Sequence, residues 1–181
     1  MNSLKILAVS LLALVLSTSL YAKSAAEIDR EANAAIQEFY KTVKGSKEFI
    51  NSSAVKGLLI FPSVVKAGVG IGGEYGEGVL RVNGKSVQYY STASASIGFQ
   101  FGLQQKSIII AFMTDEALAK FRNSNGWQAG VDGSVALAKW GAGGSISSET
   151  FQKPIVGFIF GNKGLMYNLT LEGSKFTKIV R

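Results

Sequence analysis

The chain has 181 residues, a formal net charge of +7 and 47% apolar residues, and it contains no cysteine and no histidine. This composition excludes a disulfide-stabilised fold and any site that needs a histidine base or cysteine and histidine metal ligands. The length fits one domain with its own hydrophobic core, and the positive charge favours anionic partners.

The first residues are typical of a cleavable secretory signal. Lys5 precedes an apolar run over about residues 6–16, and Leu20-Tyr21-Ala22 resembles a cleavage site. The run is shorter than the roughly 20 residues of a membrane-spanning helix. We therefore expect a signal peptide over residues 1–22 and one mature domain over residues 23–181. The expected location is the periplasm, at the surface of the inner or outer membrane.

Residues 24–44 predict an amphipathic α-helix. Ser24 and Glu27 match a capping box, and lysines gather toward the far end, where they suit the helix dipole. Gly45 is expected to end the helix, and residues 46–51 to add one short turn. Apolar side chains recur at spacings of three and four, which gives them one common face: Ile28, Ala32, Ala35, Ile36, Phe39 and Val43.

The body of the domain, about residues 55–181, predicts short β-strands separated by glycine-rich turns. Asn83-Gly84 signals a two-residue hairpin, because both residues tolerate positive φ. Residues 114–123 predict one further helix, with Thr114 as its N-cap. The expected strands are 57–61, 64–73, 77–82, 86–104, 107–112, 127–139, 155–160 and 165–171. The expected fold class is therefore α+β: a strongly bent antiparallel β-sheet, barrel-like or sandwich-like, with an N-terminal amphipathic helix and one further short helix.

The segment AGVGIGGEYGEG, residues 67–78, contains G-x-G-x-x-G at Gly68, Gly70 and Gly73. A dinucleotide-binding loop of this form opens a helix, whereas this segment runs into the expected hairpin, so we interpret it as a strand. Glycines fill most even positions, while Val, Ile and Tyr fill odd ones, so one face of the strand is nearly bare. A bare face indicates that a helix or a tightly curled neighbouring sheet packs close to it.

Motifs for catalysis are weak. Ser53 and Ser63 each precede a lysine at the S-x-x-K spacing of acyl-serine enzymes, but neither has an S-D-N or K-T-G companion. Asp132 is an acid on a face of small residues. A hydrolase built on these residues is the least favoured of three hypotheses, and we expect no catalytic residue, no metal site and no cofactor.

The favoured hypothesis is non-catalytic binding of an anionic phospholipid membrane. The helix stripe would face the bilayer and nearby lysines would contact headgroups, which gives these expected binding residues: Ile28, Ile36, Phe39, Val43, Lys41, Lys44, Lys47, Lys56 and Lys66. The alternative is a structural or protein-partner-binding envelope protein whose helix is docked on the sheet. Nucleic acid is a poor candidate partner outside the cytoplasm, and the sequence does not indicate an oligomeric state.

Several runs between about residues 54 and 175 resemble a bacterial member of the SYLF-domain family. In chain order they are VKGLLIFPSVVKAGVGIGGEYGEGVL, SASIGFQFGLQ, TDEALAKF, GVDGSVA and KGLMYNLTLEGS. The resemblance implies a lipid-binding module with a basic amphipathic N-terminal segment, acting on phosphoinositides and associated with actin in eukaryotic members. An exported bacterial protein meets neither ligand in its own cell, so anionic phospholipid is the ligand that transfers.

Two positions depart from the family pattern. Many members carry a Trp-Ser-x-Pro segment where this chain has Tyr89-Tyr90-Ser91, and an acid is often found where this chain has Lys106.

Overall fold

The structure is a computed structural model that describes residues 22–98, 104–138, 145–161, 164–165 and 169–181. The expected signal peptide therefore lies outside the described residues, apart from Ala22. The helices are α2 (Ala25–Thr42), α3 (Ser46–Ile50) and α4 (Asp115–Asn123), with a 3₁₀ turn η1 (Ser148–Gln152). The strands are β1 (Gly57–Val82), β2 (Lys85–Gly98), β3 (Gln104–Phe112), β4 (Gly126–Gln128), β5 (Ala136–Leu137), β6 (Ile155–Gly161), β7 (Gly164–Leu165) and β8 (Lys175–Ile179).

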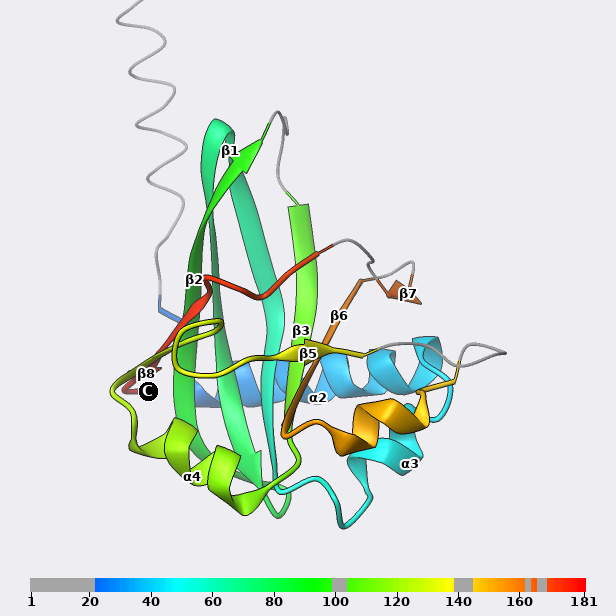
Figure 1. The fold of residues 1–181 in the computed structure, drawn as a ribbon. Helices are drawn as coiled ribbons and strands as arrows, with labels where there is room; N and C mark the ends of the chain where they lie inside the picture. The colour runs from blue at the N-terminus through cyan, green and yellow to red at the C-terminus, as the bar shows by residue number, and fades with distance from the viewer. Residues whose placement is uncertain (1–21, 99–103, 139–144, 162–163, 166–168) are drawn as a thin grey trace, which may run out of the picture.

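The strands form one curled sheet in the order β4-β8-β2-β1-β3-β6-β5, with β7 on β6 (Figure 1). Neighbouring strands are antiparallel, apart from the short parallel pair of β5 and β6. The sheet curls into a half-barrel, with α2 on one face and α4 beyond the other. This arrangement confirms the expected fold class.

Strand β1 is the organising element of the sheet. Its first part pairs with β3 and its second part with β2. A straight strand of 26 residues would span about 85 Å, but β1 turns back in its middle (Figure 1). Gly68 and Gly72 lie against each other in this bend, and Gly68 has φ +148°. Side chains at these two positions would collide with backbone, which explains the glycines.

The bare glycine face of β1 packs against the strand's own first part. A Cβ atom on Gly76 would lie 2.7 Å from the carbonyl oxygen of Ser63, and one on Gly78 would meet the carbonyl oxygen of Ile60 and lie 2.6 Å from Phe61 Cδ1. The prediction of a close neighbour on this face is confirmed. The neighbour is the curled sheet itself.

Two hydrophobic clusters lie on opposite faces of the sheet, since successive residues of a strand face opposite ways. Leu59 belongs to the cluster inside the curl, together with Phe121 and Trp127. Leu58 and Ile60 belong to the other cluster, which α2 and α3 complete. The helix therefore covers the outer face of the sheet, opposite the glycine-lined face.

Local signals predicted several elements correctly. The Ser24 hydroxyl accepts a hydrogen bond from the Glu27 N–H at the start of α2, and Thr114 caps α4 in the same way. Asn83 and Gly84 have φ values of 52° and 73°, as the predicted hairpin turn requires.

Two of the predicted strands, some of which are expected to split or bend, are shorter in the structure, and one strand was not predicted. The strand over residues 127–139 breaks after Gln128, because Gly130 has φ +84° and the Asp132 carboxylate accepts a hydrogen bond of 2.6 Å from the Gln128 N–H. Of the predicted strand 165–171, Leu165 lies in β7, residues 166–168 are outside the described part, and residues 169–171 are not in a strand. Strand β8, which pairs with β2 and β4, was not predicted.

Tyr90 lies in the cluster inside the curl and makes the stability of the fold depend on pH. Its side chain is buried, its hydroxyl has no hydrogen-bond partner among the described residues, and burial raises its pKa to about 12. The neutral phenol is favoured in the folded state, so stability is full below pH 10 and is lost as the pH rises toward 12. We expect a loss on the order of 2 kcal/mol across that range in urea denaturation.

The variant Tyr90→Phe should reduce the alkaline loss by the part that Tyr90 contributes, without lowering stability at neutral pH, because the unpartnered hydroxyl is deleted. Tyr40→Phe, on α2, is the matched control and should retain the alkaline loss. An unchanged pH profile in Tyr90→Phe would contradict the prediction.

Candidate functional site

The apolar stripe of α2 is buried against the outer face of the sheet. Ile28 and Phe39 have no exposed surface and Val43 is 1% exposed, while Ile36 is half-buried. The Phe39 ring lies 4.9 Å from that of Phe158, between centroids. The sequence left open whether this helix faces a bilayer or is docked on the sheet. In this structure it is docked, and its apolar stripe contacts the sheet.

Polar contacts at Asp29 hold the same helix. Its carboxylate accepts hydrogen bonds from Ser86 Oγ at 2.7 Å and from Tyr89 Oη at 2.9 Å, and it lies 3.7 Å from the Arg81 guanidinium. Arg81 also donates to Asn33 Oδ1 at 2.7 Å. Burial, then the hydrogen bond to Asp29, raises the pKa of Tyr89. The helix is therefore fixed by ionic contacts as well as by apolar packing.

Three of the expected lysines are exposed where α2 ends and α3 begins. Lys41 lies in the last turn of α2, Lys47 lies in α3, and Lys44 lies between them, bridged through its backbone to Ser145. None of the three forms an ion pair with a described residue. We call Lys41, Lys44 and Lys47 the α2–α3 corner. Glu48 is the exposed acid that follows them.

The other two expected lysines lie elsewhere. Lys56 donates to the Ser53 carbonyl at 3.0 Å and lines a cavity of about 750 Å³ between α2, the start of β1 and the β1–β2 hairpin, together with Ile36. Lys66 lies ten residues further along β1, roughly 30 Å of extended chain. The structure therefore places the five lysines in three separate regions.

Lys66 belongs to a small cluster around Glu74. Lys106 Nζ lies 2.6 Å from Glu74 Oε2 and Lys66 Nζ lies 4.0 Å from Glu74 Oε1. The Lys106 side chain is nearly buried, so it needs this partner. The departure from the family pattern at Lys106 is thus matched by an acid on the neighbouring strand.

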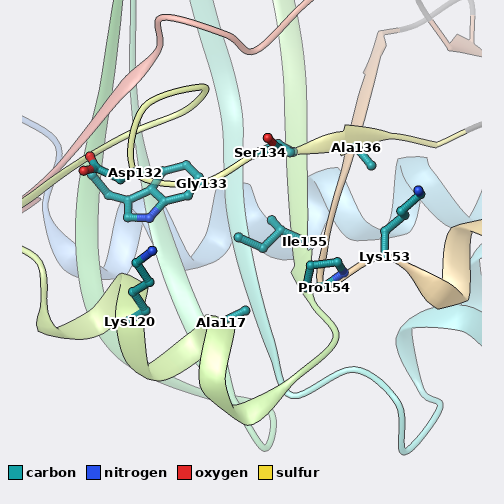
Figure 2. Close-up of a pocket in the computed structure, with 11 residues that line it drawn as sticks. Ala117, Lys120, Asp132, Gly133, Ser134, Ala136, Lys153, Pro154 and Ile155 are labelled. Atoms are coloured by element: carbon teal, nitrogen blue, oxygen red, sulfur yellow. The ribbon is translucent and has the colours of Figure 1, made fainter.

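A groove of about 370 Å³ opens beside α4, β5 and the start of β6 (Figure 2). Its lining is mostly apolar, with Lys120 and Lys153 as exposed cations. Figure 2 shows Lys120 rising from α4 on one side, Lys153 on the other and Ile155 between them. Asp132 also lines the groove, but its carboxylate accepts the hydrogen bond from Gln128 N–H.

Sequence reasoning did not find this groove. Its residues come from α4, from β4, from the segment 132–136 and from the segment 153–155, which only the folded sheet brings together. Lys120 was predicted on a helix and Lys153 before a strand, and no spacing links the two. The pattern contained no signal that both would line one groove.

The residues considered for catalysis are not brought together as a catalytic site. Asp132 closes the turn after β4, and Lys56 contacts the backbone carbonyl of Ser53. Within the described ranges, no cluster of three or more metal-binding side chains occurs and no helix is long and apolar enough to cross a membrane.

Comparison with known protein families gives a match. The family model Ysc84, described as Las17-binding protein actin regulator, matches residues 93–179. This range runs from β2 to the end of β8 and includes the Figure 2 groove. No curated protein matches the chain.

Proposed function

Because the match over residues 93–179 makes this chain a member of the SYLF-domain (Ysc84) family, a family of binding domains, we propose that it binds anionic phospholipid at a bacterial envelope membrane without catalysing a reaction. The proposed location is the periplasm, with the protein held peripherally on the inner or outer membrane. The observation that carries the proposal is the α2–α3 corner, three exposed lysines without an ion-pair partner among the described residues.

The corner binds from the surface while the helix stays docked. Each lysine near an anionic bilayer contributes about 1 kcal/mol, so three suffice for reversible attachment. The buried stripe at Ile28, Phe39 and Val43 is not needed for this contact. Lys56, which lines the cavity beside α2, and Lys66, which lies beside Glu74, are not part of the corner, and we assign them secondary roles in the same electrostatic attraction.

Neutralising the corner should abolish most of the binding. The triple variant Lys41→Gln, Lys44→Gln, Lys47→Gln should lower partitioning into anionic vesicles roughly a hundredfold in liposome co-sedimentation, because about 3 kcal/mol is lost. Raising the salt concentration should weaken wild-type binding in the same direction.

The matched control neutralises three other lysines, Lys85, Lys175 and Lys178, on β2 and β8. It changes the net charge by the same amount and should retain most of the binding. Equal binding of the wild type to neutral and anionic vesicles, or equal losses in both triple variants, would refute the proposal.

The docked helix favours a second candidate function, a structural or protein-partner-binding envelope protein. In that case neither vesicle type would bind, and the hydrogen-exchange protection of residues 28–43 would be the same with and without lipid.

A further inference from the structure

The Figure 2 groove reaches the inner hydrophobic cluster. Four of its lining residues belong to that cluster or pack against it: Ala117, Trp127, Val135 and Ile155. An apolar group placed there would contact side chains of the core and would be removed from water. The groove volume of about 370 Å³ lies at the low end of the range for small-molecule sites, which favours one slender chain over a two-chain lipid.

The cations at the groove are available to a ligand. Lys120 and Lys153 are exposed and form no ion pair with a described residue. The one acid among the described residues of the lining, Asp132, accepts a hydrogen bond of 2.6 Å from the Gln128 N–H. The groove therefore combines an apolar floor with net positive charge at its edge, which complements a molecule with an apolar chain and an anionic end.

We propose that this groove binds one single-chain anionic amphiphile, with the chain over Ile155 and the carboxylate or phosphate head at one of the two cations that flank it, Lys120 or Lys153. A free fatty acid and a lysophospholipid share this chemistry. The inference extends the proposed lipid binding to a second site, because the groove lies on different elements from the α2–α3 corner.

Trp127 provides a direct reporter, since it lines the groove and the chain has two tryptophans. In the variant Trp140→Phe it is the only one. Titration with 11-bromoundecanoate, kept below its micelle concentration, should quench Trp127 fluorescence saturably. Unbrominated undecanoate should reverse the quenching by competition. Undecanoate should compete roughly fifteenfold better than nonanoate, because each buried CH₂ contributes about fourfold.

Two sets of variants test the site in the same background. Lys120→Gln with Lys153→Gln should weaken undecanoate about tenfold or more and leave the uncharged undecanol unaffected. Lys85→Gln with Lys175→Gln is the matched charge control. Ala117→Phe should block the groove, while Ala26→Phe, on the exposed face of α2, should not. Circular dichroism establishes that each variant is folded, and the lysine pair tests the site even if Ala117→Phe fails to fold.

The head group is identified by parallel titrations with lauroyl lysophosphatidic acid, lauric acid and glycerol phosphate. Binding of either amphiphile and not of glycerol phosphate supports the proposal and names the head. Absence of bromine quenching, quenching that survives Ala117→Phe, or equal affinity for undecanol and undecanoate would overturn it. Vesicle binding that depends on the α2–α3 corner is measured separately, so this site and the proposed function can fail independently.

Discussion

Replacing Phe39 by alanine is expected to lower the free energy of unfolding by about 3–5 kcal/mol. The ring is fully buried between α2 and the outer face of the sheet, with centroids 4.9 Å from Phe158 and 5.1 Å from Phe160. Its removal deletes the contacts with both rings of β6 and leaves a cavity in the layer that joins helix and sheet. Urea denaturation followed by circular dichroism measures the loss.

The matched control is Gln37→Ala, on the exposed face of the same helix. It should change stability by less than about 0.5 kcal/mol, because no buried contact is removed. A stability loss of less than 1 kcal/mol in Phe39→Ala would mean that α2 is not docked in solution as the structure shows. Slow amide exchange over residues 28–43 in the wild type is the independent check on docking.

The docking of α2 determines which part of the protein can contact a membrane. An amphipathic helix that lies in the bilayer interface buries its apolar face in lipid, but this helix already buries Ile28, Phe39 and Val43 in the sheet layer. Releasing it would expose that layer to water and break the contacts of Asp29 with Arg81, Ser86 and Tyr89. Surface attachment through exposed lysines avoids this cost, which is why the proposed contact uses the α2–α3 corner alone.

Local sequence signals predicted the elements that depend on local chemistry. The cap at Ser24, the cap at Thr114 and the turn at Asn83-Gly84 each act over two to four residues, and each is present as expected. Strand β8 depends on distant partners: its hydrogen bonds go to β2 and β4. Its sequence KFTKI contains two lysines, which obscured the strand pattern.

The candidate sites show the same distinction between features set by local sequence and features set by the fold. The exposure of Lys41, Lys44 and Lys47 follows from their place at the end of an amphipathic helix, which the sequence shows. The separation of Lys56 and Lys66 follows from the path of β1, and the presence of both Lys120 and Lys153 at one groove follows from the curl of the sheet. Neither is encoded in spacing along the chain, so the groove required the folded structure.

Replacing Gly78 by alanine is expected to cost at least about 3 kcal/mol, the upper end of the range for overpacked cores. The new Cβ atom would meet the carbonyl oxygen of Ile60 and lie 2.6 Å from Phe61 Cδ1. Because the first obstacle is backbone of the same strand, rotation of a side chain cannot relieve the contact, and the two parts of β1 must separate. Thermal and urea denaturation should both show the loss.

Gly73→Ala is the matched control, since Gly73 lies in the same strand and its Cβ atom would have one neighbour among the described residues, the Ser94 carbonyl oxygen, 3.6 Å away. That distance is ordinary contact, and alanine restricts the unfolded chain, so this variant should be unchanged or up to about 1 kcal/mol more stable. Equal effects at the two positions would mean that the glycines reflect flexibility of β1. A large difference would establish that the Gly78 face is bare because the strand folds back onto it.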